Sequence, residues 1–260
     1  MQKNRKRIGV ALGSGGMRGM AHIGVLQVLE EAGVPIDLIS GASVGAFFGA
    51  AYAAGMDLYA LGAYAVQLLR RDVLDLPNPF RSGFFSGNKF AKLCRIVTED
   101  RTFAETCIPF WCSGVDLESG ETHYFHSGSL YRAVRASIAI PGLLRPARLE
   151  GRTYIDGGTV ESIPVDILRQ NGADVVIGVD LSITPPYRDP HPNVYRIAFR
   201  SVDIMRAAIE RLCPCGANVL IRPDVSFMDR LVPHDVGKCI AFGRTAAVHA
   251  LPEIRRALQS

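Results

Sequence analysis

Residues 36–54 read IDLISGASVGAFFGAAYAA, and their pattern predicts a strand, a sharp turn and a helix in direct succession. The first part, IDLIS, is typical of a buried strand, and the alanine-rich second part is typical of a buried helix. Ser43 lies between them, two residues after Gly41 and two residues before Gly45. A G-x-S-x-G sequence at such a junction presents a serine hydroxyl on a strained bend at the carboxyl edge of a sheet. An ordinary strand-to-helix turn is the simpler alternative.

The preceding residues repeat the same order of elements. RIGVAL (7–12) predicts a short strand, which continues through GSGGMRG (13–19) into an apolar helix that closes at Gly33. ADVVIGVDLS (173–182) is the clearest buried strand further along. Apolar strands that alternate with helices imply a parallel sheet covered on both faces. We therefore predict an α/β fold with three layers, α/β/α, and a mostly parallel central sheet.

The rest of the chain continues the alternation of helices and strands. Helices are predicted over 57–72, 88–97, 129–140, 165–172, 193–212 and 238–259. β-type runs are predicted on both sides of the ESGE turn at 118–121, before YIDGG, and over 217–224. Pro252 favours a break in the last helix. Since no linker, repeat or low-complexity segment interrupts the pattern, we predict one domain over residues 1–260.

Composition excludes several classes of protein. Hydrophobic residues make up 48% and charged residues 21%, which is typical of a soluble globular protein. The formal net charge of +4 is too small to indicate a nucleic-acid partner. The basic run KNRKR (3–7) is best explained as a solvated tail, and weak attraction to anionic lipid is the alternative. No apolar run reaches the length of a membrane span, so we expect any membrane contact to be peripheral.

The cysteines and carboxylates do not predict a metal site. Cys213 and Cys215 form C-P-C, which lacks the spacing of a zinc site, and no acidic run is typical of a calcium loop. The apolar run at 8–12 leads into GSGG rather than into a signal-peptide cleavage site. We therefore expect no metal and no cofactor, reduced thiols, and a cytoplasmic protein that contacts at most the membrane surface.

The loop GSGGMRG (13–19) has the properties of an anion-binding loop. It follows a strand and opens a helix, where backbone N–H groups lack acceptors and carry a partial positive charge. A phosphate or the oxyanion of an acyl transfer would suit it. Arg18 breaks the G-x-G-x-x-G spacing of a dinucleotide site, and the GK[ST] of a Walker loop is absent. A purely structural turn remains the alternative.

A serine nucleophile needs a base, and the sequence offers two candidates. A hydrolase with the chain order Ser, Asp, His needs a late histidine in a loop, and His234 in VPHDVG fits that position. Asp156 in YIDGG is the other candidate, because it ends an apolar run and precedes two glycines that allow close backbone approach. Its simpler reading is an ordinary Asp-Gly turn.

GSGGMRG, GASVG and YIDGG, in this order, resemble the three signatures of the patatin-like phospholipase family. RASIAIPGLLRP (135–146) and the residues that follow YIDGG, to about 180, extend the resemblance over nearly the whole chain. The sequence is most similar to the bacterial single-domain members, which are related to the catalytic domain of neuropathy target esterase. The resemblance implies a patatin-like three-layer fold and a lipid acyl-ester hydrolase, either a lysophospholipase or a phospholipase A-type esterase.

The resemblance also implies roles for individual residues. Ser43 would be the nucleophile and Asp156 its general base, as a dyad. The backbone N–H groups of Gly15, Gly16 and Met17 would form an oxyanion hole, and Arg18 would help to hold the loop. The motif glycines that would shape these turns are Gly13, Gly19, Gly41, Gly45, Gly157 and Gly158. Ser14 departs from the family, which commonly has glycine there.

Two other functions stay open on the sequence. One is an α/β-hydrolase esterase with a Ser-His-Asp triad that includes His234. The other is a catalytically silent regulator that binds acyl or phosphate ligands through the glycine loop. A fluorophosphonate probe separates the enzymes from the regulator, because it labels only an activated serine.

Apolar residues near Ser43 could bind the acyl chain of a lipid. They are Ala46, Phe47, Phe48 and Ala50, together with Phe80, Phe84 and Phe85 in the loop at 77–88. That loop contains glycines and could close as a lid; the alternative is that its aromatics cover the core. Arg81, Arg132 and Arg135 are candidates for a phosphate head group, although surface arginines are ordinary.

Overall fold

The computed structural model describes residues 5–67, 75, 83, 85–182, 194–228 and 234–259. One sheet of eight strands forms the centre, with the order β5-β6-β3-β2-β1-β7-β8 and with β4 paired to β3. The strands are β1 (Ile8–Leu12), β2 (Leu38–Ala42), β3 (Phe110–Asp116), β4 (Thr122–Phe125), β5 (Ala147–Leu149), β6 (Arg152–Asp156), β7 (Val175–Val179) and β8 (Val219–Ile221).

The sheet is mostly parallel. β1 pairs in parallel with β2 and β7, β2 with β3, and β7 with β8. β4, β5 and β6 join as antiparallel strands at the β3 side. The carboxyl ends of the parallel strands therefore lie at one edge of the sheet, where α/β folds place their ligands.

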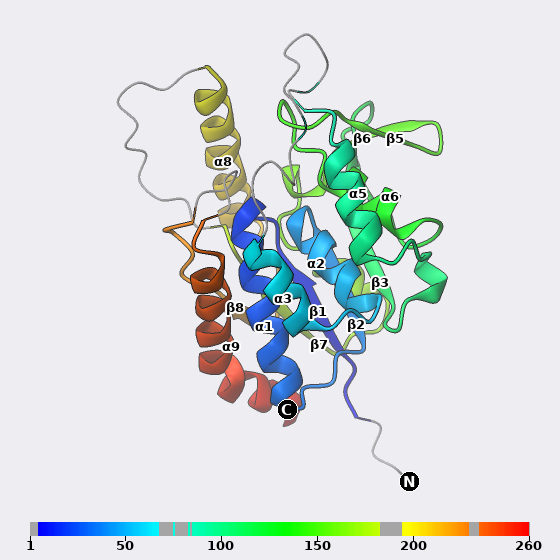
Figure 1. Cartoon of the computed structure of the whole chain (residues 1–260). Coiled ribbons are helices and arrows are strands. Elements are labelled where there is room, and N and C mark those ends of the chain that lie inside the picture. Colours follow the sequence, from blue (N-terminus) through cyan, green and yellow to red (C-terminus); the bar gives the residue numbers. More distant parts are fainter. Residues whose placement is uncertain are drawn as a thin grey trace.

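Helices follow the strands along the chain. They are α1 (Met20–Glu31), α2 (Val44–Ala53), α3 (Leu58–Gln67), α5 (Asn88–Val97), α6 (Leu130–Ser137), α7 (Asp166–Gln170), α8 (Val194–Leu212) and α9 (Val236–Gln259). Short 3-10 turns lie at Gly16–Gly19 (η1), Phe103–Glu105 (η2) and Gly157–Thr159 (η3). In Figure 1, α1, α2, α3 and α9 stand in front of the sheet, and α8 rises at the upper edge.

Two apolar clusters lie on the two faces of the sheet. The larger contains the buried side of α1, α2 and α9, and the smaller is built around Ile167 and Leu168 of α7. Strand β1 serves both, since Val10 and Leu12 belong to the larger cluster and Ala11 to the smaller. Alternate side chains of a strand point to opposite faces, so a strand buried on both sides is apolar throughout. The predicted three-layer α/β/α architecture is confirmed.

α1 and α9 cross at unusually short range. A Cβ on Gly24 would lie 2.1 Å from the Ile240 carbonyl oxygen, and a Cβ on Gly243 would lie 2.1 Å from the Ala21 carbonyl oxygen. Only glycine at both positions allows this approach. The contact fixes the long C-terminal helix on the front layer of Figure 1.

The expected break at Pro252 is wrong, because α9 continues through it to Gln259. Proline removes one helical N–H bond. Beyond it, Ile254 is fully buried in the larger cluster, and this packing keeps the last turns in place. The helix predicted over 57–72 is described as far as Gln67, and most of the loop at 77–88 lies outside the described residues.

Within the described ranges, no helix is both long enough and apolar enough to cross a bilayer. The same part of the chain holds no group of three or more His, Cys, Asp or Glu side chains arranged to bind a metal ion.

Candidate active site

Ser43 occupies a strained turn between β2 and α2. Its φ is 55° and its ψ is −123°, a region that non-glycine residues rarely adopt. A Cβ on Gly41 would lie 2.4 Å from the Gly45 carbonyl carbon, and one on Gly45 would lie 2.0 Å from the Leu12 carbonyl oxygen. The Ser43 N–H donates to the Ser137 hydroxyl at 2.9 Å, which ties the turn to the end of α6.

Asp156 meets Ser43 at this turn. The Ser43 hydroxyl donates to Asp156 Oδ2 at 2.5 Å, and both residues are buried. The Gly158 N–H donates to the other carboxylate oxygen, Oδ1, at 2.7 Å. The carboxylate is therefore held in a fixed orientation with one oxygen on the serine, an arrangement in which it can take up the hydroxyl proton.

The two glycines after Asp156 are required by close packing. A Cβ on Gly157 would lie 2.3 Å from the Ser113 carbonyl oxygen of β3. A Cβ on Gly158 would lie 2.6 Å from the Cβ of Ser14. The YIDGG turn thus packs between β3 and the glycine loop. This contact brings the YIDGG and GSGGMRG motifs together in space.

The glycine loop at 13–19 presents unused backbone donors. Its first two N–H groups are bonded, that of Gly13 to the Val179 carbonyl and that of Ser14 to the Ser162 carbonyl. In the described part of the chain, the next three N–H groups, those of Gly15, Gly16 and Met17, have no acceptor. Neighbouring N–H donors at the start of a helical segment are a favourable arrangement for binding an anion.

The loop lies against the serine turn. A Cβ on Gly19 would lie 2.3 Å from Cγ2 of Val44, the residue after Ser43. Arg18 is buried, and its Nε donates to the Met228 carbonyl at 3.1 Å. The guanidinium therefore anchors the loop to the segment after β8.

His22 of α1 contacts the backbone at the start of the glycine loop. It is fully buried, and its Nε2 lies 2.8 Å from the Gly13 carbonyl oxygen. Burial lowers the pKa of His22 to about 4, so the ring is neutral at neutral pH and Nε2–H is the donor. The ring therefore braces the backbone of the loop.

Arg206 and Ser162 also hold the loop, and the sequence analysis did not identify either residue. Arg206 of α8 donates to the hydroxyls of Ser14 and, at 2.7 Å, of Ser162. Ser14, the departure from the family pattern, thus has a hydrogen-bond partner at a sequence separation of 192 residues. No local signal in the sequence indicates such a contact.

The triad candidate His234 is exposed, and its Nε2 lies 3.0 Å from the Phe227 carbonyl oxygen. The hydroxyl proton of Ser43 is directed to Asp156. His123, His126 and His249 are also exposed, and His191 lies outside the described residues.

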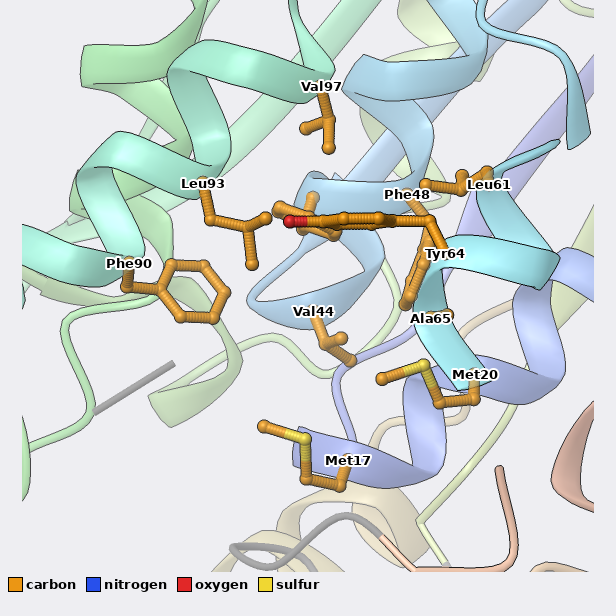
Figure 2. Close-up of a pocket in the computed structure, with 11 residues that line it drawn as sticks. Met17, Met20, Val44, Phe48, Leu61, Tyr64, Ala65, Phe90, Leu93 and Val97 are labelled. Carbon is orange, nitrogen blue, oxygen red and sulfur yellow. The ribbon is translucent and has the colours of Figure 1, made fainter. Parts of the chain in front are cut away.

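A pocket opens beside the serine turn, between α3 and α5 (Figure 2). The empty space in it, about 500 Å³, includes open solvent at its mouth. The lining is apolar apart from the hydroxyl of Tyr64; it consists of Met17, Met20, Val44, Phe47, Phe48, Leu61, Tyr64, Ala65, Phe90, Leu93 and Val97. Met17 of the glycine loop and Val44 beside the serine lie at one end in Figure 2.

The structure brings only some of the expected acyl-binding residues to this pocket. Phe47 and Phe48 line it, whereas Ala46 and Ala50 are buried elsewhere in the core. Phe85 is buried and pairs with the Leu143–Arg145 segment instead. Phe80 and Phe84, the aromatic part of the predicted lid, lie outside the described residues.

The three arginines considered for a phosphate head group differ in their surroundings. Arg135 is partly buried, and its Nη2 donates to the carbonyls of Ser86 and Arg145, so it braces two chain segments. Arg132 is exposed next to Tyr131. Arg81 lies outside the described residues.

The chain is similar to proteins of one known family. A family model described as patatin-like phospholipase matches residues 10–169. Lysophospholipase nte1 of Aspergillus fumigatus is 35% identical over 196 residues, which cover 73% of this chain and 13% of that protein. An uncharacterized NTE family protein of Mycobacterium bovis is 39% identical over 193 residues, which cover 72% of this chain and 53% of that protein. The chain thus spans only part of the length of these relatives.

Two solved structures share the fold. The crystal structure of VipD from Legionella pneumophila has a TM-score of 0.66 at 13% identity, covering 95% of this chain and 67% of that one. The type III effector protein ExoU has a TM-score of 0.51 at 15% identity, covering 98% of this chain and 54% of that one. At such low identity the likeness extends to the fold alone.

Proposed function

Because the chain belongs to the patatin-like phospholipase family, we propose that it hydrolyses acyl-ester bonds of lipids through a dyad of Ser43 and Asp156. The single observation that carries the proposal is the 2.5 Å hydrogen bond from the Ser43 hydroxyl to Asp156 Oδ2. A serine hydroxyl becomes a nucleophile when an adjacent base takes its proton. The strained backbone of Ser43 is a second support, since strain of this kind is kept where it serves a site.

The reaction would proceed in two halves. In the first, Asp156 takes the Ser43 proton while Oγ attacks the ester carbonyl carbon, and the collapsing intermediate expels the alcohol, which leaves with that proton. In the second, Asp156 takes a proton from water, the resulting hydroxide attacks the acyl-serine, and the fatty acid leaves as Oγ regains the proton. The steps use no metal and no cofactor.

The N–H groups of Gly15, Gly16 and Met17 would stabilise the oxyanion of both intermediates. Their place beside Val44 supports this role, since the loop packs on the residue next to the nucleophile. Each donor of this kind typically contributes about 3–4 kcal/mol to the transition state. Ser14, bonded to Arg206, would keep the loop in the required shape despite its difference from the family.

The apolar pocket indicates the substrate class. It begins at Met17 and Val44 and is lined by apolar side chains, so the acyl group would lie between α3 and α5. The name lysophospholipase given to the Aspergillus relative fits a substrate with a single acyl chain. We therefore propose lysophospholipids or phospholipids as the substrate class, with the free acid as product.

Three variants test the dyad. Ser43→Ala and Asp156→Asn should each abolish labelling by a fluorophosphonate probe and hydrolysis of p-nitrophenyl esters and lysophospholipids. His234→Ala should retain both, because the dyad does not use the imidazole. Circular dichroism and thermal unfolding establish that each variant is folded.

Two results would overturn the proposal. Loss of activity in folded His234→Ala, with Asp156→Asn still active, would favour the Ser-His-Asp triad. Wild-type protein that is folded but neither labelled nor active on any ester would favour the silent regulator.

A further inference from the structure

α8 presents an apolar face to solvent. Five of its large apolar side chains are between 43% and 81% exposed: Ile197, Ile204, Met205, Ile209 and Leu212. Helical spacing puts all five on one side of the helix. Contiguous exposed apolar surface on a soluble protein generally marks a binding surface.

The polar side of the same helix is turned inward. Arg206 donates to the hydroxyls of Ser14 and Ser162, and one turn further the Glu210 Oε1 atom is buried. A surface helix normally has the opposite orientation, with its apolar face on the core. The hydrogen bonds of Arg206 to Ser14 and Ser162 keep the polar side of α8 on the protein, so its apolar face is directed to solvent.

Charge along the helix favours one class of partner. By helical spacing, Arg200 and Arg211 lie along one edge of the apolar face, whereas Asp203 and Glu210 lie on the inward side. An apolar face edged by arginine is typical of helices that lie in the surface of an anionic bilayer. A second copy of this chain is less suited, because one helix face offers less than the roughly 800 Å² per partner that stable interfaces bury.

We propose that the exposed apolar face of α8 inserts into the surface of an anionic lipid bilayer and holds the glycine loop close to that surface. The choice of partner rests on the proposed function, because lipid esters reside in such surfaces. Arg206 links the two sites physically: it belongs to α8 and bonds Ser14 in the loop beside Ser43. Docking through α8 would therefore orient the active site toward its substrate.

Vesicle sedimentation without turnover tests the proposal. Purified protein is mixed with vesicles of phosphatidylcholine alone, or of phosphatidylcholine and phosphatidylglycerol in equal parts. Wild-type protein should sediment with the mixed vesicles, more weakly at high salt and more weakly with phosphatidylcholine alone. Ile204→Ser/Met205→Ser, two residues that are 52% and 55% exposed, should lower the partition coefficient about tenfold.

A matched variant controls for the general loss of apolar surface. Leu117→Ser/Val248→Ser removes side chains that are 53% and 51% exposed elsewhere, and it should bind vesicles like the wild type. Both double variants should hydrolyse a soluble short-chain ester at the wild-type rate, which shows that the fold and the site are intact.

Different results would contradict the bilayer proposal and the proposed function. Wild-type protein that sediments with neither vesicle, or equal binding by the two double variants, would overturn the bilayer proposal. A concentration-dependent dimer in light scattering that Ile204→Ser/Met205→Ser dissolves would instead assign the face to a second copy. Vesicle binding by a protein inactive on all esters would leave this inference standing while the proposed function fails.

Discussion

Asp156 lies one residue further along β3 than Ala42, because Asp156 pairs with Gly114 and Ala42 pairs with Ser113. β4 occupies the other edge of β3, so β2 and β6 share one edge. Since β2 runs parallel and β6 antiparallel to β3, their carboxyl ends meet head to head. Ser43 directly follows Ala42, and this register brings the hydroxyl to the carboxylate.

Gly157→Ala tests how far the site depends on this register. The new Cβ would lie 2.3 Å from the Ser113 carbonyl oxygen, so β6 must shift away from β3 and carry Asp156 with it. A displacement of about 1 Å can lower kcat about a hundredfold, and the overpacking should cost about 1–3 kcal/mol of unfolding free energy. Ester hydrolysis and thermal unfolding measure the two effects.

Gly237→Ala is the control for that substitution. A Cβ there would have no neighbour within 4 Å, so activity and stability should stay near those of the wild type. If folded Gly157→Ala hydrolysed esters as fast as Gly237→Ala, the close contact between β6 and β3 would not position Asp156.

The sequence predicted the parts of the site that are local. GASVG requires a turn that only glycine at 41 and 45 allows, and YIDGG places a carboxylate before two crowded glycines. Each signal lies within a few residues, so composition and spacing are enough to find it. The alternating apolar strands predicted the layers for the same reason, since burial on both faces leaves a local pattern.

The contacts between distant residues could not be predicted. Ser137 binds the Ser43 N–H across 94 residues, and Arg206 reaches Ser14 across 192. The pocket likewise joins α3 and α5 to the serine turn, and its lining follows from packing rather than from any motif. Pro252 shows the converse, because packing of Ile254 overrides a local signal.

Ser137→Ala should lower kcat about tenfold with little change in KM. The Ser43 N–H would lose its 2.9 Å acceptor, and the strained turn would hold the nucleophile less firmly. Ser40→Ala is the matched control, because that buried hydroxyl also bonds within the protein, to the Pro164 carbonyl at 2.6 Å. Both variants should lose about 1–2 kcal/mol of stability. Equal kcat in the two would show that the Ser137 bond is structural only.

Glu161 should make stability depend on pH. Burial raises the pKa of Glu161 to about 7, a nearby Asp166 adds to this, and the Tyr124 hydroxyl bond opposes it. A carboxyl whose folded pKa is raised contributes stability below its unfolded pKa, near 4.5, and loses it as pH rises through 7.

Glu161→Gln isolates this contribution in thermal unfolding at several pH values. Relative to the variant, the wild type should lose about 3 kcal/mol between acid and mildly alkaline pH. Tyr124→Phe removes the bond that favours the carboxylate and should steepen the loss. Parallel pH profiles for the wild type and Glu161→Gln would refute the raised pKa.

Ala65→Phe should shorten the acyl chains that the protein accepts. Ala65 is buried and lines the pocket on α3, so a phenyl ring there would occupy the space proposed for the alkyl chain. Hydrolysis of long-chain p-nitrophenyl esters should fall more than about tenfold in kcat/KM, whereas the acetate ester should react at the wild-type rate. Ala63→Phe adds the same ring at an exposed position of α3 and should leave both rates unchanged. An unchanged chain-length profile in folded Ala65→Phe would place the acyl group outside this pocket.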